Sequence, residues 1–200
     1  MKVYLTFYLA IIISTFCFSQ DDVFHNRNLP PQQLKQDFSI LKSSLEYNHP
    51  DLYLYTPKER LDSLFFDIEN ELEKNRIAID FFKLLTPLQH QIGNNHTVIM
   101  PPAEYLDYIK TKASLLPFIL YFDDNSYYVL ADGANEYILK EGAIIESING
   151  VKIANIVEHI SSNISIDGYN KVAASSRAVK AFSRFYAYYY GIKELSLIHI

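Results

Sequence analysis

The spacing of apolar residues changes near residue 115, and this change limits which folds the chain can form. Before residue 115, apolar residues recur at the helical spacing of three to four, as in Leu34, Phe38, Leu41 and Leu45. After it they gather in short runs, at residues 118–122 and 127–131, that are typical of strands joined by a turn. The order predicts an α+β chain in which an N-terminal helical bundle precedes a β-rich module.

Proline and capping residues mark the first two helices. Pro31 suits the first turn of a helix, and Pro50 should end that helix because the residue before a proline avoids the helical conformation. Thr56 and Glu59 have the spacing of a capping box, so we expect the Thr56 side chain to cap the second helix.

A histidine follows the third expected helix. That helix should begin near Asp80, kink or restart at Pro87 and stop at Gly93. The next residues are Asn94-Asn95-His96-Thr97, a tight turn that presents an imidazole. Because imidazole titrates near neutral pH, His96 is a candidate general base. The alternative is a helix-end histidine that only stabilises the preceding carbonyl groups.

The second half contains one strong hairpin signal. Asn149-Gly150 suits a two-residue turn, since both residues accept positive φ. We expect Ile144, Ile145 and Ile148 before it to be core residues. Helices are expected over residues 153–160 and, as one continuous segment, from residue 167 to residue 190.

The first residues are typical of an export signal. A basic Lys2 precedes an apolar run to Phe18, and cleavage is expected before Gln20. Residues 1–19 are therefore predicted to be a signal peptide, and the mature chain to be exported to the bacterial periplasm, envelope or medium. Cys17 lacks the small neighbours of a lipoprotein site, so no stable membrane anchor is expected. Without Cys17 the mature chain has no cysteine, which excludes disulfides.

Composition and spacing argue against several functions. The net charge is −5, with 23 acidic and 18 basic residues and no basic cluster, so no nucleic-acid partner is expected. The residues His49, His90 and His159 are isolated in sequence, and no cofactor or metal site is predicted. The pairs at residues 161–162 and 175–176 are nucleophiles by residue type only, since no serine lies in a Gly-x-Ser-x-Gly turn.

Three features together resemble the tail-specific, or C-terminal processing, serine proteases, including their tricorn-like members. The first is the helical region that ends in the His-Thr motif at residues 96–97. The second is Gly142-Ala143-Ile144-Ile145-Glu146-Ser147-Ile148-Asn149-Gly150, which is similar to the G-D-x-I-x-x-I-N-G strand and turn of a PDZ domain. The third is their order, with Asp-Gly-Tyr-Asn at residues 167–170 and a helix following.

The resemblance implies a division of the chain and a role for one residue. It implies a helical domain at residues 20–112, a PDZ-like module at 113–166, and at 167–200 a connecting helix with the start of an α/β catalytic core. In tricorn-like members a histidine at the position of His96 is the general base, although Asn95 replaces the usual acidic residue or serine. The nucleophilic serine belongs to the core, which is missing here, so the chain is expected to be an inactive N-terminal fragment of a serine endopeptidase.

Other interpretations remain open. Lysine-based activation of the serine is one, since many members of the family use it. A non-enzymatic periplasmic protein that binds C-terminal peptides through the PDZ-like module is the main alternative to a peptidase. A carbohydrate-binding module that uses the tyrosines of residues 186–190 is disfavoured, because tyrosines at that spacing spread around a helix. Residues 195–200 resemble translated sequencing adapter, so His199 is given no functional role. Oligomeric state and substrate are not predicted.

Overall fold

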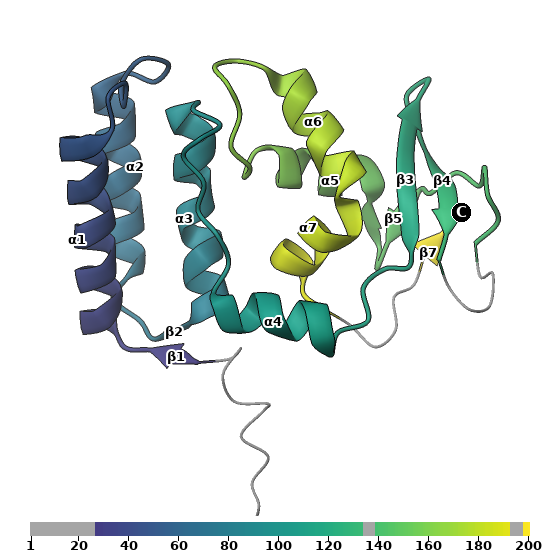
Figure 1. Ribbon diagram of the computed structural model, residues 1–200, viewed down its shortest axis with the longest axis horizontal. Helices are drawn as coiled ribbons and strands as arrows, with labels where there is room; N and C mark the ends of the chain where they lie inside the picture. The colour runs from purple at the N-terminus through teal and green to yellow at the C-terminus, as the bar shows by residue number, and fades with distance from the viewer. Residues whose placement is uncertain (1–26, 134–138, 193–197) are drawn as a thin grey trace, which may run out of the picture.

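The computed structural model describes residues 27–133, 139–192 and 198–200, which form seven helices and seven short strands. Figure 1 shows α1–α3 standing side by side at one end, β3 and β4 at the other, and α5–α7 between them. The mixed α+β class expected from the sequence is confirmed. Within the described residues no helix is both long and apolar enough to span a bilayer.

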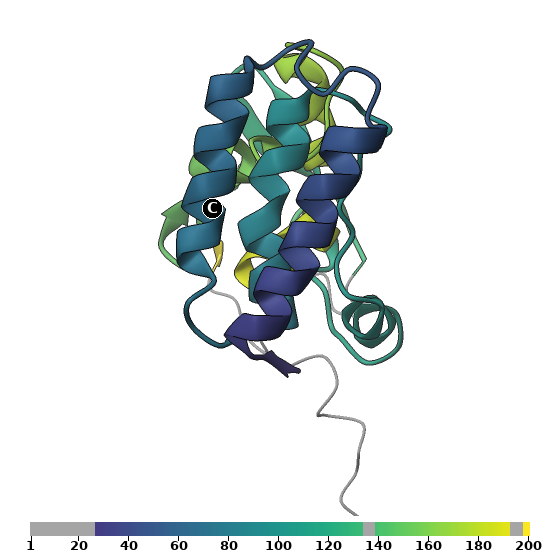
Figure 2. The same ribbon diagram turned by 90° about the vertical axis from the view of Figure 1, so that its left-hand side faces the viewer.

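The helical part consists of α1 (Pro31–Asn48), α2 (Lys58–Glu71), α3 (Ala78–Ile92) and the shorter α4 (Ala103–Thr111). Figure 2 views α1, α2 and α3 from their outer side. Their apolar stripes meet in one buried cluster that includes Leu34, Phe38, Leu61, Phe65 and Leu88. A two-residue ladder between β1 (Asn28–Leu29) and β2 (Arg76–Ile77) closes the lower end of the bundle.

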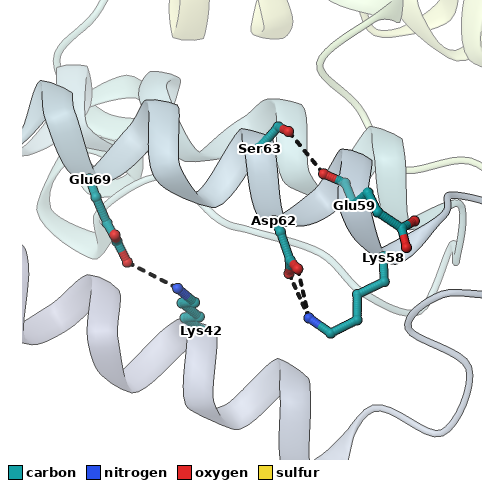
Figure 3. A network of polar contacts seen from close by, with 6 residues as sticks. All are labelled: Lys42, Lys58, Glu59, Asp62, Ser63 and Glu69. Carbon is teal, nitrogen blue, oxygen red and sulfur yellow. Dashed lines mark hydrogen bonds and ion pairs between the residues drawn. The ribbon is translucent and has the colours of Figure 1, made fainter.

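Surface ion pairs add little to this packing. Lys42 of α1 reaches Glu69 of α2 at 3.1 Å, and Lys58 reaches Asp62 one turn away at 2.7 Å (Figure 3). Exposed pairs of this kind are worth about 0–1 kcal/mol each. The buried cluster therefore determines how α1 and α2 pack.

One helix prediction for this part was wrong. Thr56 does not cap α2, whose N-cap is Pro57 and which has no side-chain cap. Instead the Thr56 hydroxyl donates to the Gln91 carbonyl at 2.6 Å, because the last carbonyls of a helix such as α3 have no partner within it. Of the two effects expected of Pro87, a restart is absent, because α3 runs through Pro87 as one helix.

The second part begins with the hairpin of β3 (Phe118–Asp123) and β4 (Ser126–Asp132). Its turn residues Asp124 and Asn125 have φ of 44° and 58°, as a two-residue turn requires. A bridge from Tyr128 to Ile144 extends β4 on its other side. β5 (Ser147–Ile148) pairs with β6 (Val151–Lys152) across Asn149-Gly150, as expected, and with β7 (Ile198–His199).

Three helices pack against these strands: α5 (Ile153–Ser161), α6 (Lys171–Lys180) and α7 (Phe182–Tyr190). The expected single helix over residues 167–190 is therefore wrong, since it is broken at Ala181. The prediction of a buried Ile144 was also wrong. Ile145 and Ile148 are 1% and 0% exposed, but Ile144 is 45% exposed, because adjacent residues of an extended segment point to opposite faces.

A third apolar cluster joins the two parts. It combines side chains of α3 (Ile79, Phe82), α4 (Tyr105, Ile109) and α7 (Ala187, Tyr188). The Tyr105 hydroxyl donates to the Ala187 carbonyl at 2.7 Å inside this cluster. Helix α7 therefore contacts both the helical bundle and the sheet-bearing part.

Candidate functional site

The turn that carries His96 is built by its own backbone and one amide side chain. Helix α3 ends at Gly93, whose φ of 69° is left-handed and suits glycine. The Asn94 side-chain oxygen accepts from the His96 amide at 2.8 Å, and the Asn94 carbonyl accepts from the Thr97 amide at 3.0 Å. The backbone at His96 is therefore held on both sides of the residue.

The imidazole of His96 is exposed and makes no hydrogen bond with any residue in the described ranges. Both ring nitrogens are thus open to an incoming group. An exposed ring on a held backbone can take up or release a proton without first breaking an internal contact. This geometry fits the hypothesis that His96 is a general base.

Residues far along the chain hold the same turn from the other side. The Asn95 amide donates to the Asp167 carboxylate at 3.0 Å, and the Gly168 amide donates to the Gly93 carbonyl at 2.8 Å. Arg177 of α6 donates from Nη1 to the Asn95 side-chain oxygen and, at 2.8 Å, to the Ser165 carbonyl. The His96 turn is therefore attached to the segment that follows α5 and to α6.

Tyr55 fills the space between these two segments. A Cβ built on Gly93 would lie 3.0 Å from Tyr55 Cδ2, and one on Gly168 would lie 3.1 Å from Tyr55 Cε1. The Tyr169 hydroxyl donates to the Tyr55 carbonyl at 2.9 Å, with the two rings edge to face at 5.8 Å. Both glycines thus allow close approach of the tyrosine ring.

His49 is a neighbour that the sequence did not reveal. Its Nδ1 accepts from the Asp51 amide at 3.3 Å, so the neutral ring carries its proton on Nε2. Nε2 lies 2.9 Å from Thr97 Oγ1 and donates to it. The two residues are 48 positions apart, and no sequence signal pairs them.

The other histidines have separate surroundings. His90 Nδ1 donates to the Ile164 carbonyl at 3.1 Å. His159 lies edge to face against Tyr189 and Tyr190, and burial, followed by the charge of Lys83, lowers its pKa. Among the described residues, no three His, Cys, Asp or Glu side chains come together as a metal site would need.

The serine candidates do not complete a catalytic pair. Ser161 and Ser162 donate to helix carbonyls, of Val157 at 2.6 Å and of His159 at 2.9 Å. No serine hydroxyl in the described ranges is hydrogen-bonded to a histidine ring. The described residues therefore contain a candidate base without a paired nucleophile.

Comparison with known proteins gives a likeness of fold. No family model and no curated protein matches the sequence. A crystal structure of a serine-to-alanine mutant of CPAF has a TM-score of 0.51 and 13% identity, over 76% of this chain and 28% of the CPAF chain. Mature CPAF has a TM-score of 0.49 and 12% identity over the same shares. The chain thus spans 28% of the length of CPAF, and the likeness to the mutant shows that it shares a fold with that part of CPAF.

Proposed function

We propose that this chain is the N-terminal part of an exported serine peptidase of the tail-specific type, with His96 as its general base. The observation that carries the proposal is the His96 turn, whose backbone is held by two separate parts of the chain while its ring is exposed. Likeness of fold to part of CPAF supports a relation to tail-specific proteases.

In this proposal His96 takes the proton of a serine hydroxyl as that oxygen attacks a peptide carbonyl. The same ring then returns the proton to the leaving amine. The serine comes from a catalytic core outside the 200 residues, which agrees with the small share of CPAF that the chain covers. His49 has a positioning role, because its contact with Thr97 holds the residue after the base.

The proposal includes an exported location and a polypeptide substrate. The basic and apolar N-terminal residues supply the reason for export. N-terminal sequencing of the secreted protein should begin at Gln20. Recovery of an uncleaved chain from the cytoplasm would contradict this part of the proposal.

Activity measurements separate the 200-residue chain from a longer product of the same gene. We expect the chain alone to show no turnover of fluorogenic peptides. A product extended past residue 200 should cleave them and be blocked by a serine-directed inhibitor. Inhibitor-sensitive turnover by the 200-residue chain would contradict the assignment of the serine to a missing core.

The second candidate is a non-enzymatic protein that binds C-terminal peptides. The two-stranded order of the β3–β4 sheet favours it, because β3 is an edge strand in the described part and a peptide could add to it. Side chains of Ile119 and Tyr121, 52% and 51% exposed, flank that edge. Fluorescence polarisation with labelled C-terminal peptides tests it: micromolar binding and a stop codon after residue 200 would favour the binding protein over the peptidase.

A further inference from the structure

A cavity of about 330 Å³ lies between α5 and α6, and none of the residues that hold the His96 turn lines it. Its volume falls at the lower end of the range of about 300–1,000 Å³ for small-molecule sites. Ten residues from four segments line it: His90, Tyr127, Ala154, Val157, Glu158, Ser161, Ser162, Lys171, Ala174 and Ser175. A ligand the size of one amino acid would fit.

Helical spacing brings the lining residues of each helix to one face. On α5, residues 154, 157, 158 and 161 follow the i, i+3, i+4, i+7 pattern, and on α6 residues 171, 174 and 175 follow i, i+3, i+4. Val157 and Ala174 are 2% and 1% exposed and form an apolar floor. The cavity therefore has an apolar base between two helix faces.

Opposite charges stand on the two helices. Glu158 belongs to α5 and Lys171 to α6, and neither makes an ion pair with any residue in the described part of the chain. The Glu158 carboxylate is close to the Tyr127 phenol, whose pKa is raised first by burial and then by that negative charge. One cavity thus offers a cation and an anion that do not neutralise each other.

Two further polar side chains line the cavity. Ser175 lies one helical turn from Lys171, and its hydroxyl makes no hydrogen bond within the described residues. His90 donates through Nδ1 to the Ile164 carbonyl, which leaves Nε2 of the neutral ring as an acceptor. A carboxylate suits Lys171 and Ser175, whereas an ammonium group suits Glu158 and His90.

We propose that this cavity binds a small zwitterion with an apolar side chain, of the class of the free branched-chain amino acids. The carboxylate lies at Lys171, the ammonium group at Glu158, and the side chain over Val157 and Ala174. The site is independent of His96 and of the proposed peptidase activity.

The test is a calorimetric titration of the 200-residue chain with L-leucine, with N-acetyl-leucine, which lacks the ammonium group, and with leucinamide, which lacks the carboxylate. We expect saturable binding of leucine and binding of each analogue weaker by about tenfold or more. Lys171→Gln and Glu158→Gln should each weaken leucine binding by about tenfold or more, since each removes one charged partner. Lys180 is an exposed lysine of α6 outside the cavity, so Lys180→Gln should leave the affinity for leucine unchanged.

Several results would overturn the proposal. Leucine that fails to saturate the chain at about 10 mM would exclude a site of useful affinity. N-acetyl-leucine that binds as well as leucine would indicate a simple anion site. Leucine binding that is unchanged in both Gln variants, with thermal unfolding showing that they are folded, would indicate a different location. Amide shifts of Ala154 and Ala174 in a leucine titration by NMR give a second readout of the location.

Discussion

Gly93 combines a left-handed backbone with close contact to Tyr55. Its φ is 69°, and an added Cβ would lie 3.0 Å from Tyr55 Cδ2. Gly93→Ala should therefore lower the free energy of unfolding by about 2–4 kcal/mol, the sum of a left-handed alanine and a crowded ring. Urea unfolding of the purified chain measures this change.

Gly142 provides the matched control. Its φ of 79° is also left-handed, but a Cβ there would meet nothing within 4 Å. Gly142→Ala should lower the free energy of unfolding by only about 1–2 kcal/mol, the backbone cost alone. Equal losses at Gly93 and Gly142 would show that Tyr55 does not restrict the His96 turn.

For single residues, the sequence predicts backbone conformation better than it predicts contacts between side chains. Gly93 was expected to stop a helix because glycine accepts the left-handed conformation, and the structure confirms it. The approach of Tyr55 to Gly93 and of His49 to Thr97 depends on how α1, α2 and α3 pack together. The spacing of residues along the chain does not indicate contacts between distant residues, so neither contact could be predicted.

At the scale of elements, Arg177 links α6 to the His96 turn. Its guanidinium donates to the Asn95 side chain and to the Ser165 carbonyl. Arg177→Met removes both donors and should loosen the turn, so the Asn95 amide should exchange with solvent about fivefold faster or more. Hydrogen exchange followed by NMR measures this rate.

Lys180→Met is the control for that variant, because Lys180 is exposed on the same helix and, among the described residues, is hydrogen-bonded to neither Asn95 nor Ser165. It should leave the Asn95 amide unchanged. If the Asn95 amide exchanges at the same rate in Arg177→Met and in Lys180→Met, Arg177 does not support the turn, and the contacts of Asp167 and Gly168 remain its support from distant segments.

Element boundaries were predicted where a local signal determines them. Asn149-Gly150 predicted its hairpin, because few residue pairs accept positive φ at both positions. The break at Ala181 had no such signal, since neither glycine nor proline stands there. The reason for it is tertiary: Phe182 is buried and stacks on Phe118 of β3 at 6.1 Å, while α6 before the break packs on α5.

At the scale of the whole molecule, α7 brings tyrosines into the interior between the two parts. The Tyr189 hydroxyl donates to the Asn163 carbonyl at 2.9 Å, and burial raises the pKa of Tyr189 to about 12. Because the folded-state pKa lies above the unfolded value, this tyrosine's contribution to stability is fully present below pH 10. It is lost as the pH rises from about 10 to 12.

Tyr189→Phe should therefore flatten the loss of stability between pH 8 and pH 11 while costing about 1 kcal/mol at pH 8 for the lost hydrogen bond. Denaturant unfolding at the two pH values measures both effects. Tyr47→Phe is the control, since Tyr47 is 86% exposed. An alkaline loss of the same size in Tyr189→Phe and in the unchanged chain would contradict a role for Tyr189.

The α+β fold class could be predicted from the sequence, but the junction between the helical and the sheet-bearing parts could not. The change of apolar spacing near residue 115 predicted helices followed by strands, as the structure has them. The cluster of α3, α4 and α7 joins residues about 100 positions apart, and apolar periodicity does not indicate which distant elements pack together. The His96 turn also depends on contacts between distant segments, so His96 was found from sequence while its supporting residues Arg177 and Asp167 were not.

The measurement that tests the central claim most directly is the turnover number of the His96→Ala variant in the extended gene product. We predict that kcat for a peptide substrate falls by about 10⁴-fold or more, because the serine loses its general base. Tyr47→Ala, a change at an exposed residue of α1, should keep full activity. A His96→Ala enzyme that is folded and retains the kcat of the unchanged protein would contradict the account.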